Sequence, residues 1–82
     1  MSDRELLRRI SVNPKIMTGK PVISGTRVTV ETVLNQLAHG ATEEEILADY
    51  PKLTEADIRA CLLFALRNIT KFSSIPVAME SA

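Results

Sequence analysis

The segment from Gly19 to Val30, Gly-Lys-Pro-Val-Ile-Ser-Gly-Thr-Arg-Val-Thr-Val, constrains the fold of this chain more than any other. Pro21 lacks a backbone N–H, which suits the start of an edge strand, and Val22 favours an extended backbone. Gly25 permits a positive φ at a turn, and Thr29 can cap a helix. The segment therefore predicts a strand, a turn, a second extended stretch and the start of a helix.

The spacing of apolar residues changes after this segment and predicts three helices. Apolar residues spaced three and four positions apart indicate a helix that begins at Val30. Gly40 suits the left-handed position after the last turn of this helix. Capping boxes predict three further helix starts, at Ser2 with Glu5, at Thr42 with Glu45 and at Thr54 with Asp57. The first of these is a short helical turn. Pro51 ends the middle helix, and the helix after Thr54 is the longest.

The basic and acidic residues are separated along the chain although the 82 residues have no net charge. Residues 1–30 have six basic and two acidic side chains, whereas residues 31–82 have four basic and eight acidic ones.

Apolar residues at Ile10, Val12 and Ile16 predict a short strand before the Gly19–Val30 segment. The expected fold class is mainly α: a three-helix core behind a two-stranded N-terminal ribbon, in one domain over residues 1–71, followed by a flexible tail, 72–82.

A short second helix, a tight connection and a longer third helix are the layout of a helix-turn-helix, whose last helix can enter the DNA major groove. The third helix begins with the acidic residues Glu55 and Asp57, so it is poorly suited to reading bases. DNA contacts are therefore expected to be mainly to phosphate. The candidate DNA-binding residues are Arg4, Arg8, Arg9, Lys15, Lys20 and Arg59.

The third helix is apolar on two sides, which predicts a partner. One stripe, from Ile58 through Cys61, Leu62, Ala65 and Leu66 to Ile69, is assigned to the core. The candidate homodimer contacts lie off that stripe, at Leu63, Phe64 and Arg67, unless the ribbon covers them within the monomer. The tail offers Phe72, Ile75 and Val77 as candidate partner contacts, although such a tail is commonly disordered.

No set of residues predicts an enzyme, a metal centre or a cofactor site. His39 is the single histidine, and Cys61, the single cysteine, lies on an apolar helix stripe. Gly19-Lys20 lacks the flanking residues of a phosphate loop, because Pro14 and Pro21 occupy the required positions. Without a signal peptide, a membrane span or a disulfide, the expected location is the cytoplasm.

Two segments resemble domain of unknown function family 433, a group of small, mostly bacterial proteins. They are residues 19–30, with Gly-Thr-Arg, and residues 39–58, with Asp-Tyr-Pro-Lys-Leu-Thr, and the resemblance covers about residues 10–68. The resemblance implies a homeodomain-like or winged helix-turn-helix core. Some members resemble the VapB-type antitoxins that bind DNA and neutralise a PIN-domain ribonuclease toxin.

The predicted function is that of an antitoxin-like transcriptional regulator, which binds double-stranded DNA as a homodimer. The alternative is a protein-interaction module that keeps the same fold without binding DNA. Arg27 has two interpretations, a phosphate contact or a structural clamp between ribbon and helices through a carboxylate such as Asp49. The clamp is favoured because Gly25 and Thr29 serve the local fold.

Overall fold

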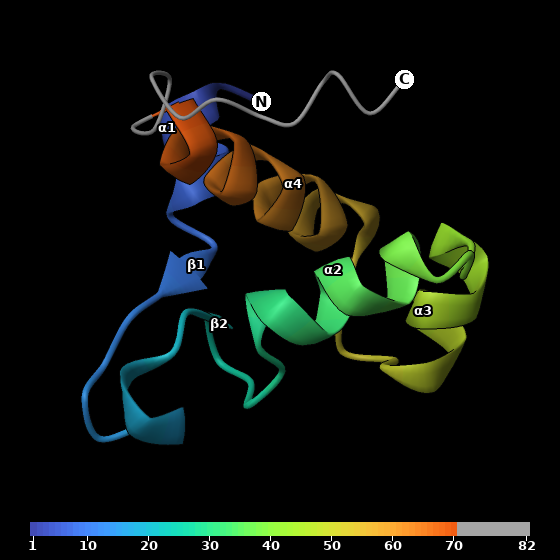
Figure 1. Cartoon of the computed structure of the whole chain (residues 1–82), viewed down its shortest axis with the longest axis horizontal. Helices are drawn as coiled ribbons and strands as arrows, with labels where there is room; N and C mark the ends of the chain where they lie inside the picture. The colour runs from blue at the N-terminus through green and yellow to red at the C-terminus, as the bar shows by residue number, and fades with distance from the viewer. Residues whose placement is uncertain (71–82) are drawn as a thin grey trace, which may run out of the picture.

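Helices make up most of residues 1–70, which are the residues that the computed structural model describes. This part of the chain has four α-helices, α1 (Asp3–Leu7), α2 (Val30–Ala38), α3 (Glu43–Asp49) and α4 (Glu55–Ile69) (Figure 1). It also has two strands, β1 (Ile10–Ser11) and β2 (Val22–Ile23), and a 3₁₀ turn, η1 (Met17–Gly19). The mainly helical fold with an N-terminal ribbon is confirmed.

Local capping sets the helix starts as the sequence predicts. Complete capping boxes are present at the three predicted positions, Ser2 with Glu5, Thr42 with Glu45 and Thr54 with Asp57. Thr29 Oγ1 accepts a hydrogen bond from the N–H of Thr32 at 3.0 Å and so caps α2. Each cap satisfies a backbone N–H that the first helical turn leaves without a partner.

The two strands form an antiparallel ribbon in which Ile10 pairs with Ile23 and Ser11 with Val22. Gly25, with φ +80°, allows the chain to reverse direction after β2. The returning chain forms a single bridge between Val22 and Thr29 rather than a third full strand. Thr29, the residue that bridges to the ribbon, is therefore also the N-cap of α2.

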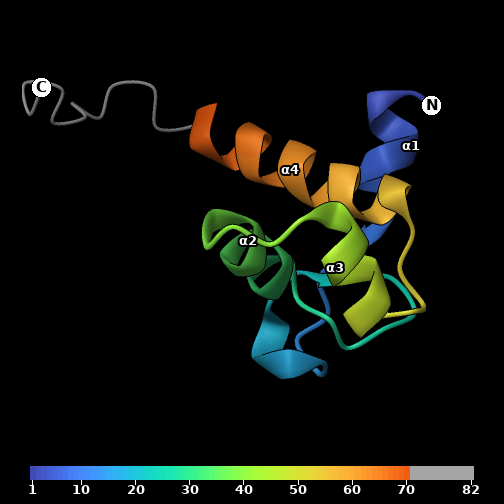
Figure 2. The same ribbon diagram turned by 90° about the vertical axis from the view of Figure 1, so that its right-hand side faces the viewer.

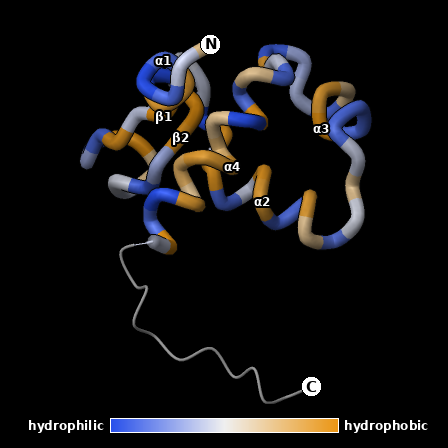
Figure 3. The backbone as a smooth tube through the Cα atoms, turned by 90° about the horizontal axis from the view of Figure 1, so that it is seen from above, coloured by the Kyte–Doolittle hydropathy of each residue, from blue (hydrophilic) through white to orange (hydrophobic). Residues whose placement is uncertain are grey.

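The core lies where α2, α3 and α4 meet the ribbon (Figure 2). Its central residues share almost complete burial and are Ile23, Val33, Ile46, Ile58 and Cys61. Hydrophobic positions occur on both ribbon strands as well as on α4 (Figure 3). Helix α1 packs against α4 and buries Leu6, so the N-terminal residues are part of the folded domain.

Helix α4 turns a different face to the core from the one its apolar spacing predicts. Leu62, Leu66 and Ile69 were assigned to the core, but they are 47%, 54% and 66% exposed. Ala60, which is not part of that stripe, is fully buried, and Phe64 packs against the core. Helices α1, α2 and α3 and strand β1 pack against α4, and the spacing of the apolar residues of α4 does not specify which of its sides they cover.

Candidate nucleic-acid and partner interface

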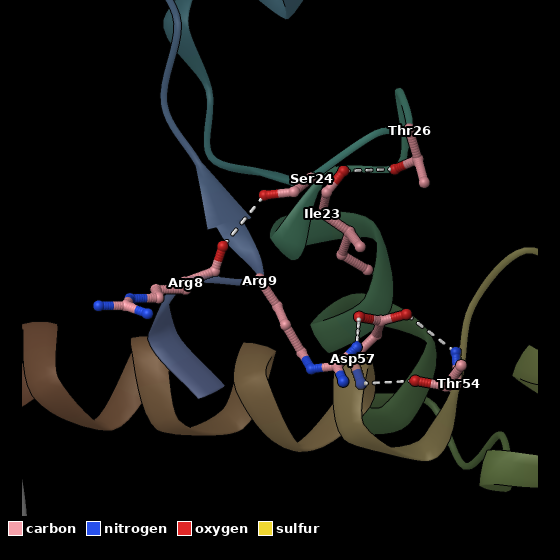
Figure 4. A network of polar contacts seen from close by, with 7 residues as sticks. All are labelled: Arg8, Arg9, Ile23, Ser24, Thr26, Thr54 and Asp57. Carbon is pink, nitrogen blue, oxygen red and sulfur yellow. Dashed lines mark hydrogen bonds and ion pairs between the residues drawn. The ribbon is translucent and has the colours of Figure 1, made fainter. Parts of the chain in front are cut away.

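Arg9 and Asp57 join the N-terminal segment to helix α4 (Figure 4). Arg9 Nη1 donates to Asp57 Oδ1 at 3.1 Å, and Asp57 is only 6% exposed. Asp57 Oδ2 also accepts the N–H of Thr54 at 2.9 Å, within the capping box of α4. A buried carboxylate needs such partners because it has lost its water. Arg9, predicted to contact phosphate, is therefore engaged inside the protein.

Ser24 fixes the ribbon to the same place. Its backbone N–H donates to the carbonyl oxygen of Arg9 at 2.7 Å, and its hydroxyl donates to the carbonyl oxygen of Arg8 at 3.3 Å. The Arg8 side chain itself is exposed. The loop after β2, the end of α1 and the start of α4 thus form one connected unit.

The predicted DNA-binding residues fall into separate groups. Arg4 lies on α1 and Arg8 is its C-cap, and both line one hollow with Arg67. Arg8 also lines a second hollow with Lys52, which sequence reasoning did not select. Lys15 and Lys20 belong to the loop before β2, where Lys20 Nζ lies 3.2 Å from Glu31 Oε1. Arg59 is exposed on α4.

The predicted clamp between Arg27 and Asp49 is wrong in its residues. Both line the hollow between the Gly25–Val28 turn and the end of α3, but residues 1–70 contain no ion pair within 4.0 Å that involves either of them. Arg27 is exposed. The clamp between the N-terminal region and the helices is made by Arg9 and Asp57 instead.

The large apolar residues that α4 leaves exposed differ from the predicted dimer contacts. Phe64 packs against the core, Leu63 is half-buried, and Arg67 Nη2 donates to Asp3 Oδ2 at 2.7 Å. These contacts are made within one chain. We use the name outer row for the large apolar residues that α4 leaves exposed, namely Leu62, Leu66 and Ile69. The candidate tail contacts Phe72, Ile75 and Val77 lie outside the described residues.

Cys61 is unsuited to nucleophilic chemistry. Burial, together with the negative charge of Asp57 one turn earlier, raises the pKa of its thiol to about 12. The thiolate is the reactive form of cysteine, and with this raised pKa it is scarcely populated near neutral pH.

Residues 1–70 hold no group of three or more His, Cys, Asp or Glu side chains placed to bind a metal ion. No helix in the described part of the chain is long and apolar enough to cross a membrane.

The comparisons with known proteins give the family. A family model described as "Protein of unknown function (DUF433)" matches residues 10–65. The chain belongs to the DUF433 family. A DUF433 member from Anabaena variabilis ATCC 29413, known from a crystal structure, has a similar fold, with a TM-score of 0.73 and 30% sequence identity. That similarity covers 87% of this chain and 70% of the other.

A curated relative of this DUF433 chain is the uncharacterized protein y4eO of Sinorhizobium fredii (strain NBRC 101917 / NGR234). The two are 36% identical over 59 residues, which are 72% of this chain. The matched region is 27% of y4eO, so the DUF433 chain spans about a quarter of the length of this relative. The family resemblance read from the sequence is confirmed, and the family itself is described as one of unknown function.

Proposed function

We propose that this DUF433 protein is a non-enzymatic helix-turn-helix regulator of the VapB antitoxin type that binds double-stranded DNA as a homodimer. The observation that supports it is the unit formed by α3, the link 50–54 and α4. Ile46 of α3, Leu53 of the link and Ile58 of α4 are buried in one core, which fixes the two helices against each other. Helix α2 packs on both of them, as the first helix of a three-helix DNA-binding unit does.

Exposed cations beside the start of α4 support phosphate contacts. Arg8 and Lys52 line the same hollow next to Thr54, the N-cap of α4, and Arg4 of α1 lines a neighbouring hollow with Arg8. None of the three has an ion-pair partner within residues 1–70. Free cations at this position can neutralise backbone phosphates on either side of a groove. We therefore assign the main phosphate contacts to Arg4, Arg8 and Lys52, with Arg59 as a further contact on α4.

The length of α4 lets its two halves have different roles. The first half, from Glu55 to Arg59, lies beside the exposed cations, whereas the outer row lies in the second half. Apolar residues at i, i+4 and i+7 form a continuous strip on one helix face, and a second copy of the same strip would cover it around a twofold axis. We assign the outer row to the homodimer contact.

A toxin of the PIN-domain ribonuclease class is the proposed protein partner. The antitoxin role follows from the resemblance of some family members to VapB-type proteins, and the candidate toxin contacts remain Phe72, Ile75 and Val77. An extended apolar segment can bind in a groove of a partner through alternate side chains.

DNA binding is tested by fluorescence anisotropy with a labelled duplex from the region upstream of the protein's own reading frame, in a salt series. The affinity should fall steeply with salt, because each phosphate contact contributes about 0.9 to the slope of log K against log salt. Arg8→Gln and Lys52→Gln should each lower that slope by about 0.9 per protomer. Lys15→Gln, an exposed cation in the separate loop, is the matched control and should leave the slope unchanged.

The DNA proposal is abandoned if the wild-type protein leaves the duplex unbound at low salt. It is also abandoned if the Arg8 and Lys52 variants bind with the same slope as the control. In either case the phosphate contacts assigned above are incorrect.

A protein-interaction module without DNA binding is the second candidate, because the exposed face of α4 is acidic at Glu55 and apolar along the outer row. Bases are read by hydrogen-bonding side chains, and this face offers few of them. The double variant Arg4→Glu, Arg8→Glu separates the candidates, because neither residue lines the hollow at the Gly25–Val28 turn. Regulation of the promoter should be lost under the first, whereas under the second a partner that co-purifies with the wild type remains bound.

A further inference from the structure

The two segments that identify the family meet at one hollow on the surface. The turn Gly25–Val28 forms one side, and the end of α3 with its link, Asp49–Lys52, forms the other. The hollow has a volume of about 660 Å³. Sites for ligands and for anchoring side chains generally enclose about 300–1,000 Å³, so it is large enough for one bulky side chain and its neighbours.

The floor of the hollow is apolar, and a hydrogen bond holds one of its side chains in place. Ile16, Val22 and Val28 line it together with Tyr50. The Tyr50 hydroxyl accepts a hydrogen bond from Gln36 Nε2 at 3.2 Å, which fixes the ring to α2. An aliphatic side chain placed here would leave water and pack on preformed surface.

Two cations line the hollow without an ion pair to any of residues 1–70. They are Arg27 and Lys52. Among the described residues Asp49 is the single carboxylate in the lining, so the formal charge of these lining residues is positive. Charge complementarity therefore favours an occupant with a carboxylate beside an apolar group.

The turn that carries Arg27 is held in shape before any occupant arrives. Thr26 Oγ1 donates to the carbonyl oxygen of Ile23 at 2.7 Å and accepts the N–H of Val28 at 3.0 Å. Gly25 adopts φ +80°, which a side chain would oppose. Because the turn is already ordered, the guanidinium of Arg27 can bind an occupant with little further loss of backbone conformational entropy.

We propose that this hollow binds a short peptide segment of a partner protein in which an apolar side chain stands next to a carboxylate. The apolar side chain would lie on the apolar floor of the hollow. The carboxylate would accept hydrogen bonds from Arg27, with Lys52 nearby. Asp49 would accept a backbone N–H of the segment. Duplex DNA is a poorer occupant, because Asp49 repels phosphate and the apolar floor makes no favourable contact with a charged backbone. This inference goes beyond the proposed function and does not depend on DNA binding.

The test is a titration of the ¹⁵N-labelled full chain, followed by amide chemical shifts, with the peptide acetyl-Gly-Leu-Glu-Gly-amide. Saturable shifts should be confined to the Gly25–Val28 turn and the Asp49–Lys52 link. Replacing Glu by Gln, or Leu by Ser, in the peptide should weaken binding by about tenfold or more, since each change removes one of the two recognised groups.

Variants of the protein identify the groups that bind. Arg27→Gln and Lys52→Gln should each weaken binding of the Leu-Glu peptide by about fivefold or more, while Lys15→Gln, an exposed cation outside the hollow, leaves it unchanged. Unchanged amide spectra elsewhere establish that each variant is folded. The proposal is wrong if shifts scatter over the surface, if the Gln peptide binds equally well, or if both hollow variants bind as the wild type does. It is also wrong if a short DNA duplex produces the same local shifts at lower concentration.

Discussion

The ion pair between Arg9 and Asp57 gives the sharpest test of how this fold is held together. Arg9→Met keeps most of the aliphatic stem and removes the charge, so a nearly buried Asp57 carboxylate loses its cationic partner. Removing one partner of a fully buried pair costs about 3–5 kcal/mol. Here the Arg9 side chain is 34% exposed and Asp57 keeps its bond from Thr54, so we expect a loss of about 2 kcal/mol.

That loss is large for a domain of this size. Small domains have unfolding free energies of about 5–15 kcal/mol, and in such a domain 1 kcal/mol lowers Tm by about 4–8 °C. Urea unfolding followed by circular dichroism should show the expected drop in midpoint with little change in slope. The control is Lys20→Met, which breaks an exposed pair with Glu31 at 3.2 Å and should cost less than about 1 kcal/mol.

A double-mutant cycle with Asp57→Asn separates the pair from the other effects of each change. The coupling energy should be about 1–2 kcal/mol, because the two charges interact at low exposure. If Arg9→Met costs no more than Lys20→Met, or if the coupling is near zero, Arg9 does not clamp the N-terminal segment to α4.

Two further predictions follow from α4. Leu66→Glu should leave the unfolding free energy of the monomer within about 0.5 kcal/mol of the wild type, because the side chain is exposed. The same change should abolish the homodimer in equilibrium sedimentation. A wild-type protein that sediments as a monomer at tens of micromolar contradicts the assigned dimer contact. Cys61 ionises in the unfolded chain near its ordinary pKa of 9.0 but in the folded chain only near about 12. Its contribution to stability should therefore be complete below pH 9 and fall as pH rises from about 9 to 12, and comparison with Cys61→Ala isolates this dependence. A native Cys61 that reacts with iodoacetamide at pH 8 as fast as the unfolded chain contradicts the burial.

Several parts of the fold could be predicted because they depend on residues close together in sequence. The capping boxes at Thr42 and Thr54 join groups three positions apart, and Gly25 and Pro51 restrict the backbone where they stand. The helix positions, the ribbon and the family resemblance were accordingly confirmed. The homodimer, the DNA contacts and the toxin partner remain predictions.

The candidate site was less predictable because it combines residues from distant segments. The sequence placed Arg4 and Arg8 in a basic segment, but Lys52 joins Arg8 only because the link after α3 folds back beside α1. Arg9 was grouped with the phosphate contacts since charge type and sequence position do not distinguish a paired arginine from a free one. Its distance of 48 positions from Asp57 left no local signal.

The sequence by itself determined where the four helices of residues 1–70 begin and where α2 and α3 end, because caps, glycine and proline act on their nearest neighbours. Only the tertiary structure decided which face of α4 is buried. Ala60 and Phe64 are covered by other elements while Leu62 and Leu66 remain outside, although all four suit an apolar environment. Burial depends on which surfaces are available to cover a helix, and the spacing of its own residues does not specify them.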